Sequence, residues 1–193
     1  MAENAVPALP GVRTKLPVGT IVVLGVWAVC TAVYHLGGNG LFLAVRRDPE
    51  ALRAGEVWRV ISPVLVQPDS VLTVLGLGVF AAVLGTVTER AFGTGRWVVL
   101  FLAGALAGHL IGEIWQPYSG GVSVGFCGPL GALAVCLILT RKWQPGVVVL
   151  AGAVALTVIT DIHGPAILAG ALAGLPLIRS GARALPATQP TRE

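Results

Sequence analysis

A cysteine and a histidine in this sequence have the residue types and surroundings that nucleophilic catalysis requires. Cys127 lies in Gly125-Phe126-Cys127-Gly128, and His163 lies in Asp161-Ile162-His163-Gly164. A thiol beside an imidazole is a nucleophile with its base. A helix start and a neighbouring imidazolium both favour the thiolate, which is the reactive form. We therefore predict a Cys127–His163 dyad. The alternative is a buried packing cysteine and a helix-capping histidine.

The composition indicates the environment in which these residues lie. Of the 193 residues, 55% are hydrophobic and 11% are charged, and the net charge is +4. Soluble domains have about 25% charged residues, and a soluble domain of this size leaves much of its surface in water. The basic residues flank apolar runs, where they set membrane topology. The composition therefore indicates an integral membrane protein and argues against a nucleic-acid partner.

Apolar runs near 20 residues, about the length that spans a bilayer, recur along the chain. Six spans are predicted, at about 17–37, 70–88, 97–115, 124–140, 144–160 and 162–178. They predict an all-α fold, a compact bundle of six transmembrane helices in one domain covering 17–178. Two crossings separate the starts of 124–140 and 162–178. These two helices should therefore run parallel and hold Cys127 and His163 at similar depth.

The segments outside the spans predict the orientation. These are an N-terminal tail (1–16), an external loop (38–59) and a C-terminal tail (179–193) that is predicted to be disordered. The side that carries both termini has nine basic residues: Arg13, Lys15, Arg90, Arg96, Arg141, Lys142, Arg179, Arg183 and Arg192. The opposite side has four: Arg46, Arg47, Arg53 and Arg59. The positive-inside rule then predicts that both termini are cytoplasmic. Trp58 should anchor the external loop in the membrane interface.

Small residues recur at intervals of four in several predicted helices. The lines are Gly104, Gly108 and Gly112; Gly128 and Ala132; and Ala166, Gly170 and Gly174. Small residues at this spacing allow helix backbones to approach closely in lipid. We expect the helices that carry them to form the tightly packed centre of the bundle.

The order of several motifs resembles the rhomboid intramembrane proteases and their rhomboid-like relatives, from about Gly55 to Leu177. Trp58-Arg59 resembles the Trp-Arg motif of the first loop. Gly125-Phe126-Cys127-Gly128 resembles the Gly-x-Ser-Gly nucleophile motif, with cysteine for serine. The remaining matches are Glu89-Arg90, Gly93 and Arg96 after the second span, and His163 followed by Gly170 and Gly174 on the last.

The resemblance implies a serine–histidine dyad protease that cuts membrane helices on the external side. This chain departs from the pattern twice, because Cys127 replaces the serine and a His-x-x-x-Asn pair on the second span is missing. Thr73 and Leu77 stand at the places of that pair, within one residue. The pair helps to hold the developing oxyanion, and loss of one such donor costs about 10²–10³ in rate. The oxyanion candidates that remain are Thr73 and the backbone around Gly125 and Gly128.

Three functions therefore stay open. The first is a Cys127–His163 intramembrane peptidase that acts through a thioester, and the second is a pseudoprotease that binds membrane clients without cutting them. Both predict membrane lipids and transmembrane-helix proteins as partners, in a bacterial inner membrane. The third, a small transporter, has little support because the spans contain few polar residues and no internal repeat. No cofactor, metal spacing or phosphate loop is indicated.

Two further polar groups have competing interpretations. His109 and Glu113 are four residues apart and share a helix face, which fits either a proton relay or a mutually satisfied pair. Asp161 precedes His163 by two residues, and we expect it to be the N-cap of the last helix rather than a third catalytic group.

Overall fold

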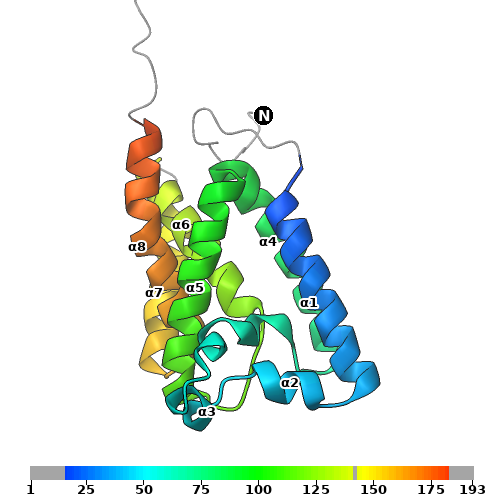
Figure 1. The fold of residues 1–193 in the computed structure, drawn as a ribbon. Coiled ribbons are helices and arrows are strands. Elements are labelled where there is room, and N and C mark those ends of the chain that lie inside the picture. The colour runs from blue at the N-terminus through cyan, green and yellow to red at the C-terminus, as the bar shows by residue number, and fades with distance from the viewer. Residues whose placement is uncertain (1–15, 141–142, 183–193) are drawn as a thin grey trace, which may run out of the picture.

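The computed structural model describes residues 16–140 and 143–182, with the side chains described up to Ile178. The described chain is helical (Figure 1). Its long helices are α1 (Val18–Gly37), α4 (Val71–Phe92), α5 (Thr94–Trp115), α6 (Ser123–Leu139), α7 (Trp143–Val158) and α8 (His163–Ala182). Between α1 and α4 lie the short helices α2 (Gly40–Val45) and α3 (Pro49–Arg53) and the 3₁₀ turns η1 (Val57–Val60) and η2 (Ser62–Leu65).

The long helices correspond to the six predicted spans, and the predicted all-α membrane bundle is confirmed. By length and composition α1, α4 and α5 are able to cross a membrane, and α6, α7 and the described part of α8 are shorter apolar helices. The main differences are at helix ends. α4 continues to Phe92, α5 begins at Thr94, and Gly93 between them has a φ of +81°. α8 continues to Ala182, because a helix can extend beyond its apolar run.

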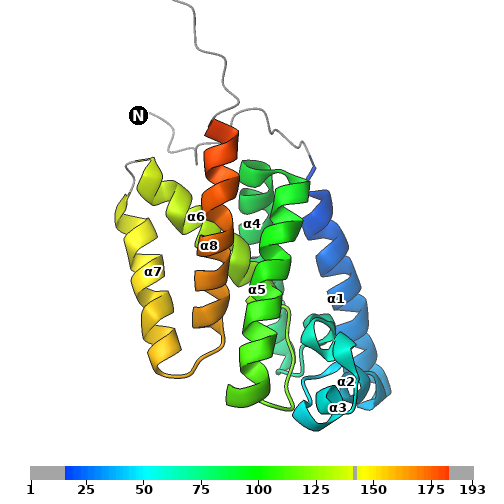
Figure 2. The ribbon, with the colours of Figure 1, turned by 60° about the vertical axis from the view of Figure 1, so that its left-hand side comes forward.

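The predicted orientation stays a prediction. Most of both predicted tails lies outside the described residues, and so do six of the nine basic residues on that side: Arg13, Lys15, Arg141, Lys142, Arg183 and Arg192. The first residues of α1 and the last residues of α8 lie at one end of the bundle, and α2 and α3 lie at the other (Figures 1 and 2). This arrangement is compatible with an even number of crossings.

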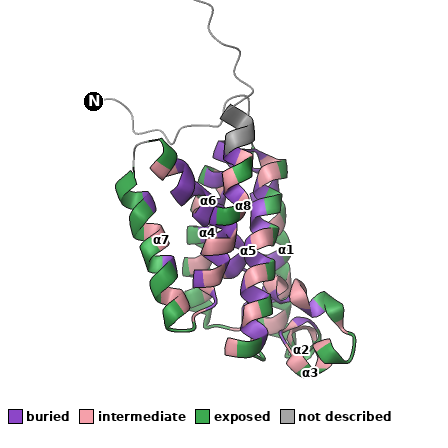
Figure 3. Cartoon of the chain, turned by 90° about the vertical axis from the view of Figure 1, so that its left-hand side faces the viewer, coloured by how far each residue is buried: buried purple, intermediate pink, exposed green. Residues whose placement is uncertain are grey.

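α6 is the central helix of the bundle. It packs along α8 and α5, and buried residues extend over most of its length (Figure 3). By contrast, α1, α4 and α7 expose large apolar side chains such as Leu36, Leu72 and Val158. Apolar surface on this scale is costly in water and favourable in lipid. The burial pattern therefore fits a protein whose outer helices face the bilayer.

Glycines bring the three central helices together backbone to backbone. A Cβ atom at Gly170 of α8 would collide with the backbone of Gly128 in α6. A Cβ at Gly104 of α5 would lie 2.5 Å from the nitrogen of Gly128. The predicted close approach of the small-residue helices is thus confirmed. The three helices therefore pack closely around Gly128, and a larger residue at these glycines would push them apart.

Glu89 joins three helix ends at the end of the bundle where α1 begins. Its fully buried carboxylate accepts hydrogen bonds from the backbone N–H groups of Gly19 (2.8 Å) and Thr20 (2.7 Å) at the start of α1. It also accepts from the hydroxyls of Thr20 and Thr94, both at 2.7 Å. A carboxylate at a helix N-terminus satisfies N–H groups that have no partner within the helix. Arg96, from the same motif, has a buried Nη1 without a hydrogen-bond partner among the described residues.

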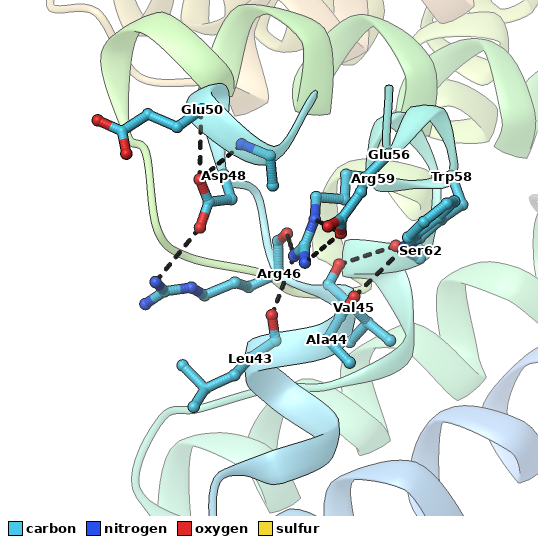
Figure 4. Close-up of polar contacts among 11 residues, drawn as sticks. Leu43, Ala44, Val45, Arg46, Asp48, Glu50, Glu56, Trp58, Arg59 and Ser62 are labelled. Carbon is cyan, nitrogen blue, oxygen red and sulfur yellow. Dashed lines mark hydrogen bonds and ion pairs between the residues drawn. The ribbon is translucent and has the colours of Figure 1, made fainter. Parts of the chain in front are cut away.

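The segment between α1 and α4, which is predicted to be external, is held together by the Trp-Arg motif (Figure 4). Arg59 is 6% exposed and donates from Nη1 to the carbonyl oxygens of Leu43 (3.0 Å) and Arg46 (2.9 Å). Its Nε donates to Glu56 Oε2 at 2.8 Å. The indole N–H of Trp58 donates to the carbonyl of Ala44, and half of this side chain is exposed. The motif thus holds α2 against η1, and the interfacial role of Trp58 stays a prediction.

Candidate active site

The starts of α6 and α8 place a hydroxyl against an imidazole. Ser123 is the first residue of α6 and His163 is the first residue of α8. Both helices run from the end that carries α2 and α3 towards the opposite end (Figure 2). Ser123 Oγ lies 2.8 Å from His163 Nε2. A hydroxyl hydrogen-bonded to an imidazole is the arrangement in which serine is activated as a nucleophile.

The segment that precedes α6 fixes the position of Ser123. Gly121 N–H donates to the carbonyl of Pro63 at 2.8 Å, and Val122 N–H donates to Gln67 Oε1 at 3.2 Å. Gly121 has a φ of +154°, and a Cβ there would lie 2.7 Å from that same oxygen. This backbone conformation favours glycine, because residues with a side chain rarely adopt it. The contacts hold the chain against the residues before α4 and direct Ser123 towards α8.

The imidazole of His163 is held from its other side by Asp161. Asp161 Oδ1 lies 2.6 Å from His163 Nδ1 and accepts the backbone N–H of His163 at 2.8 Å. Partial burial acts to raise the pKa of Asp161, but these two hydrogen bonds and the nearby His163 hold that pKa below its usual value. An ionised carboxylate only accepts hydrogen bonds, so the proton of a neutral ring lies on Nδ1. His163 Nε2 is then an acceptor for the Ser123 hydroxyl.

Cys127 lies one turn further along α6 and is not the hydrogen-bond partner of His163. Four residues of helix correspond to a rise of about 6 Å, so the sulfur is deeper in the bundle than the ring at the start of α8. Cys127 packs against an apolar cluster that includes Ile162 and Ala166. Among the described residues no hydrogen bond joins Cys127 to His163. The starts of α6 and α8 lie side by side, as predicted. The α6 side chain that contacts His163 is that of Ser123 and not that of Cys127.

A cavity of about 340 Å³ opens beside this pair. Ser123 and His163 line one part of it, and Thr73 and Leu77 of α4 line another. Thr73 Oγ1 lies 2.9 Å from the hydroxyl of Ser70. Of the predicted oxyanion candidates, Thr73 therefore reaches the cavity. Gly125 and Gly128 do not line it, and a Cβ at either would meet α5, at the ring of Phe101 and at the carbonyl of Leu100 respectively.

Backbone N–H groups at the start of α6 are available near the hydroxyl. No hydrogen bond from the N–H of Ser123 or Val124 is found within the described part of the chain. The first four N–H groups of an α-helix have no partner inside the helix, and they form its positive end. The first turn of α6 therefore places two free backbone donors next to the Ser123 hydroxyl, which contacts His163 of α8.

A buried cation lies on the cavity wall. Arg47 donates from Nη1 to His109 Nδ1 at 2.8 Å and from Nε to the carbonyl of Gln116 at 2.9 Å. Arg47 and His109 are 1% and 0% exposed. Burial lowers the pKa of Arg47 to about 10, although the charge of Glu113 acts in the opposite direction. Arg47 is therefore charged at neutral pH. Both carboxylate oxygens of Glu113 are without a hydrogen-bond partner in the described residues, so the His109–Glu113 pair is not formed.

The sequence also contains a signal for Ser123, which the prediction of the nucleophile did not use. Gly121-Val122-Ser123 supplies the first three residues of a Gly-x-Ser-Gly motif, with Val124 at the place of the second glycine. Cys127 was preferred because Gly128 follows it directly. The candidate site residues that the sequence did not predict are thus Ser123 and, on the cavity wall, Arg47.

Comparison with known proteins gives the family. A model of the rhomboid domain matches residues 54–178. The chain is also 30% identical over 98 residues to the rhomboid protease GluP of Bacillus subtilis (strain 168). That alignment covers 50% of this chain and 19% of the relative, so this chain matches about a fifth of that protein's length. The region that the rhomboid domain matches contains both Ser123 and His163. The chain belongs to the rhomboid family.

Proposed function

We propose that this membrane protein is an intramembrane serine peptidase in which Ser123 is the nucleophile and His163 is the general base. The observation that carries the proposal is the 2.8 Å contact between Ser123 Oγ and His163 Nε2 at the wall of a cavity. The family supports the same class of chemistry. Cys127 was the nucleophile predicted from sequence, and Ser123 replaces it here because Ser123 has the hydrogen bond to the base.

The proposed reaction follows from the protonation states of the site. Ser123 Oγ attacks the carbonyl carbon of a peptide bond while its proton moves to His163 Nε2. The imidazolium then protonates the leaving amine, and an ester between Ser123 and the acyl part of the substrate is left. Water enters through the cavity and gives a proton to Nε2. The hydroxide attacks the ester carbonyl carbon, and the bond to Ser123 Oγ breaks as His163 returns the proton to Ser123. The acyl part leaves as a carboxylic acid, which loses its proton to solvent.

The negative charge on the tetrahedral intermediate needs hydrogen-bond donors. The free N–H groups of Ser123 and Val124 lie at the positive end of α6, where an oxyanion is favoured. The Thr73 hydroxyl on the facing wall is a third donor. Leu77 beside it has no donor. Since one missing donor costs about 10²–10³ in rate, we expect slow cleavage.

The substrate class follows from the surroundings of the site. The cavity lies within an apolar bundle whose outer helices expose Leu72 and other large apolar residues. A transmembrane helix of another protein reaches such a site through lipid, whereas a soluble chain does not. We therefore propose a single transmembrane segment as the substrate, cut near its external end, in a bacterial inner membrane with both termini of the enzyme cytoplasmic.

A pseudoprotease that binds membrane clients is the second candidate. The observation that favours it is that Leu77, which has no hydrogen-bond donor in its side chain, lines the cavity beside Ser123 and His163. The two candidates share the bundle, the cavity and the class of partner. They differ in whether an acyl-enzyme forms and turns over.

The test uses the full chain reconstituted in lipid vesicles with a panel of fluorescent single-span substrates. Cleavage should be abolished by Ser123→Ala and by His163→Ala and should persist in Cys127→Ala. A fluorophosphonate should label Ser123, as located by peptide mass spectrometry. Cleavage that persists in Ser123→Ala and is lost in Cys127→Ala would transfer the nucleophile role to Cys127. Absence of cleavage and labelling, together with stable capture of one substrate, would support the binder.

A further inference from the structure

Asp161 has no role in the proposed reaction of Ser123 and His163, but its carboxylate contacts the His163 ring. Its Oδ1 lies 2.6 Å from His163 Nδ1, on the ring edge opposite the nitrogen that meets Ser123. Asp161 is held by the turn between α7 and α8. Its N–H donates to the carbonyl of Leu156 at 2.9 Å, and Thr160 before it has a φ of +58°. A threonine with positive φ is a strained conformation that surrounding contacts must maintain.

We propose that Asp161 is a positioning residue for His163, so that Ser123, His163 and Asp161 act as a triad. This inference rests on the proposed function. The carboxylate accepts the Nδ1 proton, which fixes the tautomer with an unprotonated Nε2 aimed at Ser123. When the proton of Ser123 arrives on Nε2, the imidazolium is formed 2.6 Å from a negative charge. Asp161 stays ionised throughout, because the proton on Nδ1 is not transferred.

The charges around His163 explain why a carboxylate matters at this position. Arg47 from the external segment and its partner His109 of α5 lie near the cavity on one side, and Asp69 lines the cavity before α4. A buried cation such as Arg47 disfavours a second positive charge nearby. Asp161 is the negative group in direct contact with the ring and offsets this effect.

The competing interpretation is that Asp161 is only an N-cap. Its Oδ1 does accept the backbone N–H of His163, as a residue at a helix start does. Asparagine is as good an N-cap as aspartate and has no charge. Asp161→Asn therefore keeps the cap and removes the charge opposite Nδ1, whereas Asp161→Ala removes both. A capping role predicts that the asparagine variant behaves like the wild type.

The kinetic test compares wild type, Asp161→Asn and Asp161→Ala in lipid vesicles with a single-span substrate. In proteases with a buried triad aspartate, the asparagine exchange lowers kcat by about 10⁴. Asp161 has 31% of its side chain exposed, and solvent screens its charge, so we expect a loss of about 10–10² in kcat with little change in KM. The acidic limb of the kcat/KM profile should move to lower pH, because the neutral form of the base is favoured once the carboxylate is gone. Asp48→Asn, the same exchange at the N-cap of α3, is the matched control.

Two measurements separate the possible failures. If Ser123→Ala retains cleavage, the proposed function fails. If Ser123→Ala is inactive but Asp161→Asn has wild-type kcat and an unshifted acidic limb, only the triad is overturned. Should Asp161→Asn fail to fold, ¹⁵N NMR of histidine-labelled wild type decides the tautomer, with the signal assigned by His163→Ala. A neutral ring protonated on Nδ1 supports the triad, and one protonated on Nε2 overturns it.

Discussion

Replacing Leu77 by asparagine tests whether a missing donor limits the rate. Leu77 lines the same cavity as Ser123 and His163, and an asparagine amide brings an N–H donor to its place. One oxyanion donor is worth about 2.7 kcal/mol at the lower end of measured values. Ordering a flexible side chain on binding costs about 1 kcal/mol. The remaining stabilisation of about 1.7 kcal/mol corresponds to a gain of about 20-fold in kcat/KM.

The assay measures initial cleavage rates of one single-span substrate in lipid vesicles. Leu77→Met is the matched variant, because methionine has a similar volume but adds no donor. Each variant is also made in a Ser123→Ala background, which should be inactive in both cases. Thermal unfolding in detergent verifies that the asparagine variant is folded, since Leu77 is partly buried.

A folded Leu77→Asn protein that cleaves no faster than Leu77→Met would refute the reasoning, because the rate would then not be limited by donors on α4. Activity of Leu77→Asn in the Ser123→Ala background would refute the choice of nucleophile instead. The two results are distinct, so one series tests both the oxyanion argument and the identity of the reacting side chain.

Three further predictions concern stability. Glu89→Gln loses at least two hydrogen bonds to a charged acceptor and should lower the free energy of unfolding by about 3 kcal/mol or more, measured by thermal unfolding in detergent, with exposed Glu50→Gln near wild type. Gly170→Ala inserts a Cβ into the backbone of α6 and should cost at least about 2 kcal/mol, while Gly152→Ala, where a Cβ meets nothing within 4 Å, should not destabilise. Folding lowers the pKa of Asp161 below its usual value of 3.8, so the ionised carboxylate stabilises the fold fully above about pH 3.8. This stabilisation is lost as the pH falls through the lower pKa of the folded protein. The difference in unfolding free energy between wild type and Asp161→Ala should therefore shrink in that acidic range.

Much of the bundle could be predicted because its physical causes are local in the sequence. Apolar runs near 20 residues identify the long helices, and small residues four apart identify which helices pack at the centre. Gly128 and Gly170 meet in the structure as that pattern predicts. The parallel course of α6 and α8 follows from counting crossings, and it placed His163 correctly beside the start of α6.

The sequence prediction selects Cys127 and not Ser123, the nucleophile proposed from the structure, because two candidate motifs follow one another in the chain. Gly125-Phe126-Cys127-Gly128 has both glycines of the Gly-x-Ser-Gly pattern, whereas Gly121-Val122-Ser123-Val124 lacks the second one. The structure begins α6 at Ser123. Ser123 Oγ lies 2.8 Å from His163 Nε2, and this contact between two helices is not contained in either motif. Apolar runs do not define helix starts so finely, because polar contacts such as Gln67 to Val122 set them.

The partner of His109 could not be predicted, because it comes from a distant segment. Local spacing pairs His109 with Glu113, four residues away on the same face. In the structure Arg47, 62 residues away, bonds the ring instead. Arg47 reaches α5 because the hydrogen bonds of Arg59 fold the segment between α1 and α4 compactly. The spacing of residues along the sequence does not predict that contact.

The balance of donors and acceptors around Ser123 indicates which part of the site governs the rate. In the proposed mechanism, His163 accepts the proton of the Ser123 hydroxyl, and Asp161 contacts the other nitrogen of the ring. On the oxyanion side, α4 offers one hydroxyl at Thr73 and no amide. Gln67 takes the N–H of Val122, so the next two amides of α6 are the ones left free. Because stabilising the oxyanion usually contributes more to the catalysis of acyl transfer than any other effect, we expect the donors at the start of α6 and on α4 together to set the cleavage rate in the proposed mechanism.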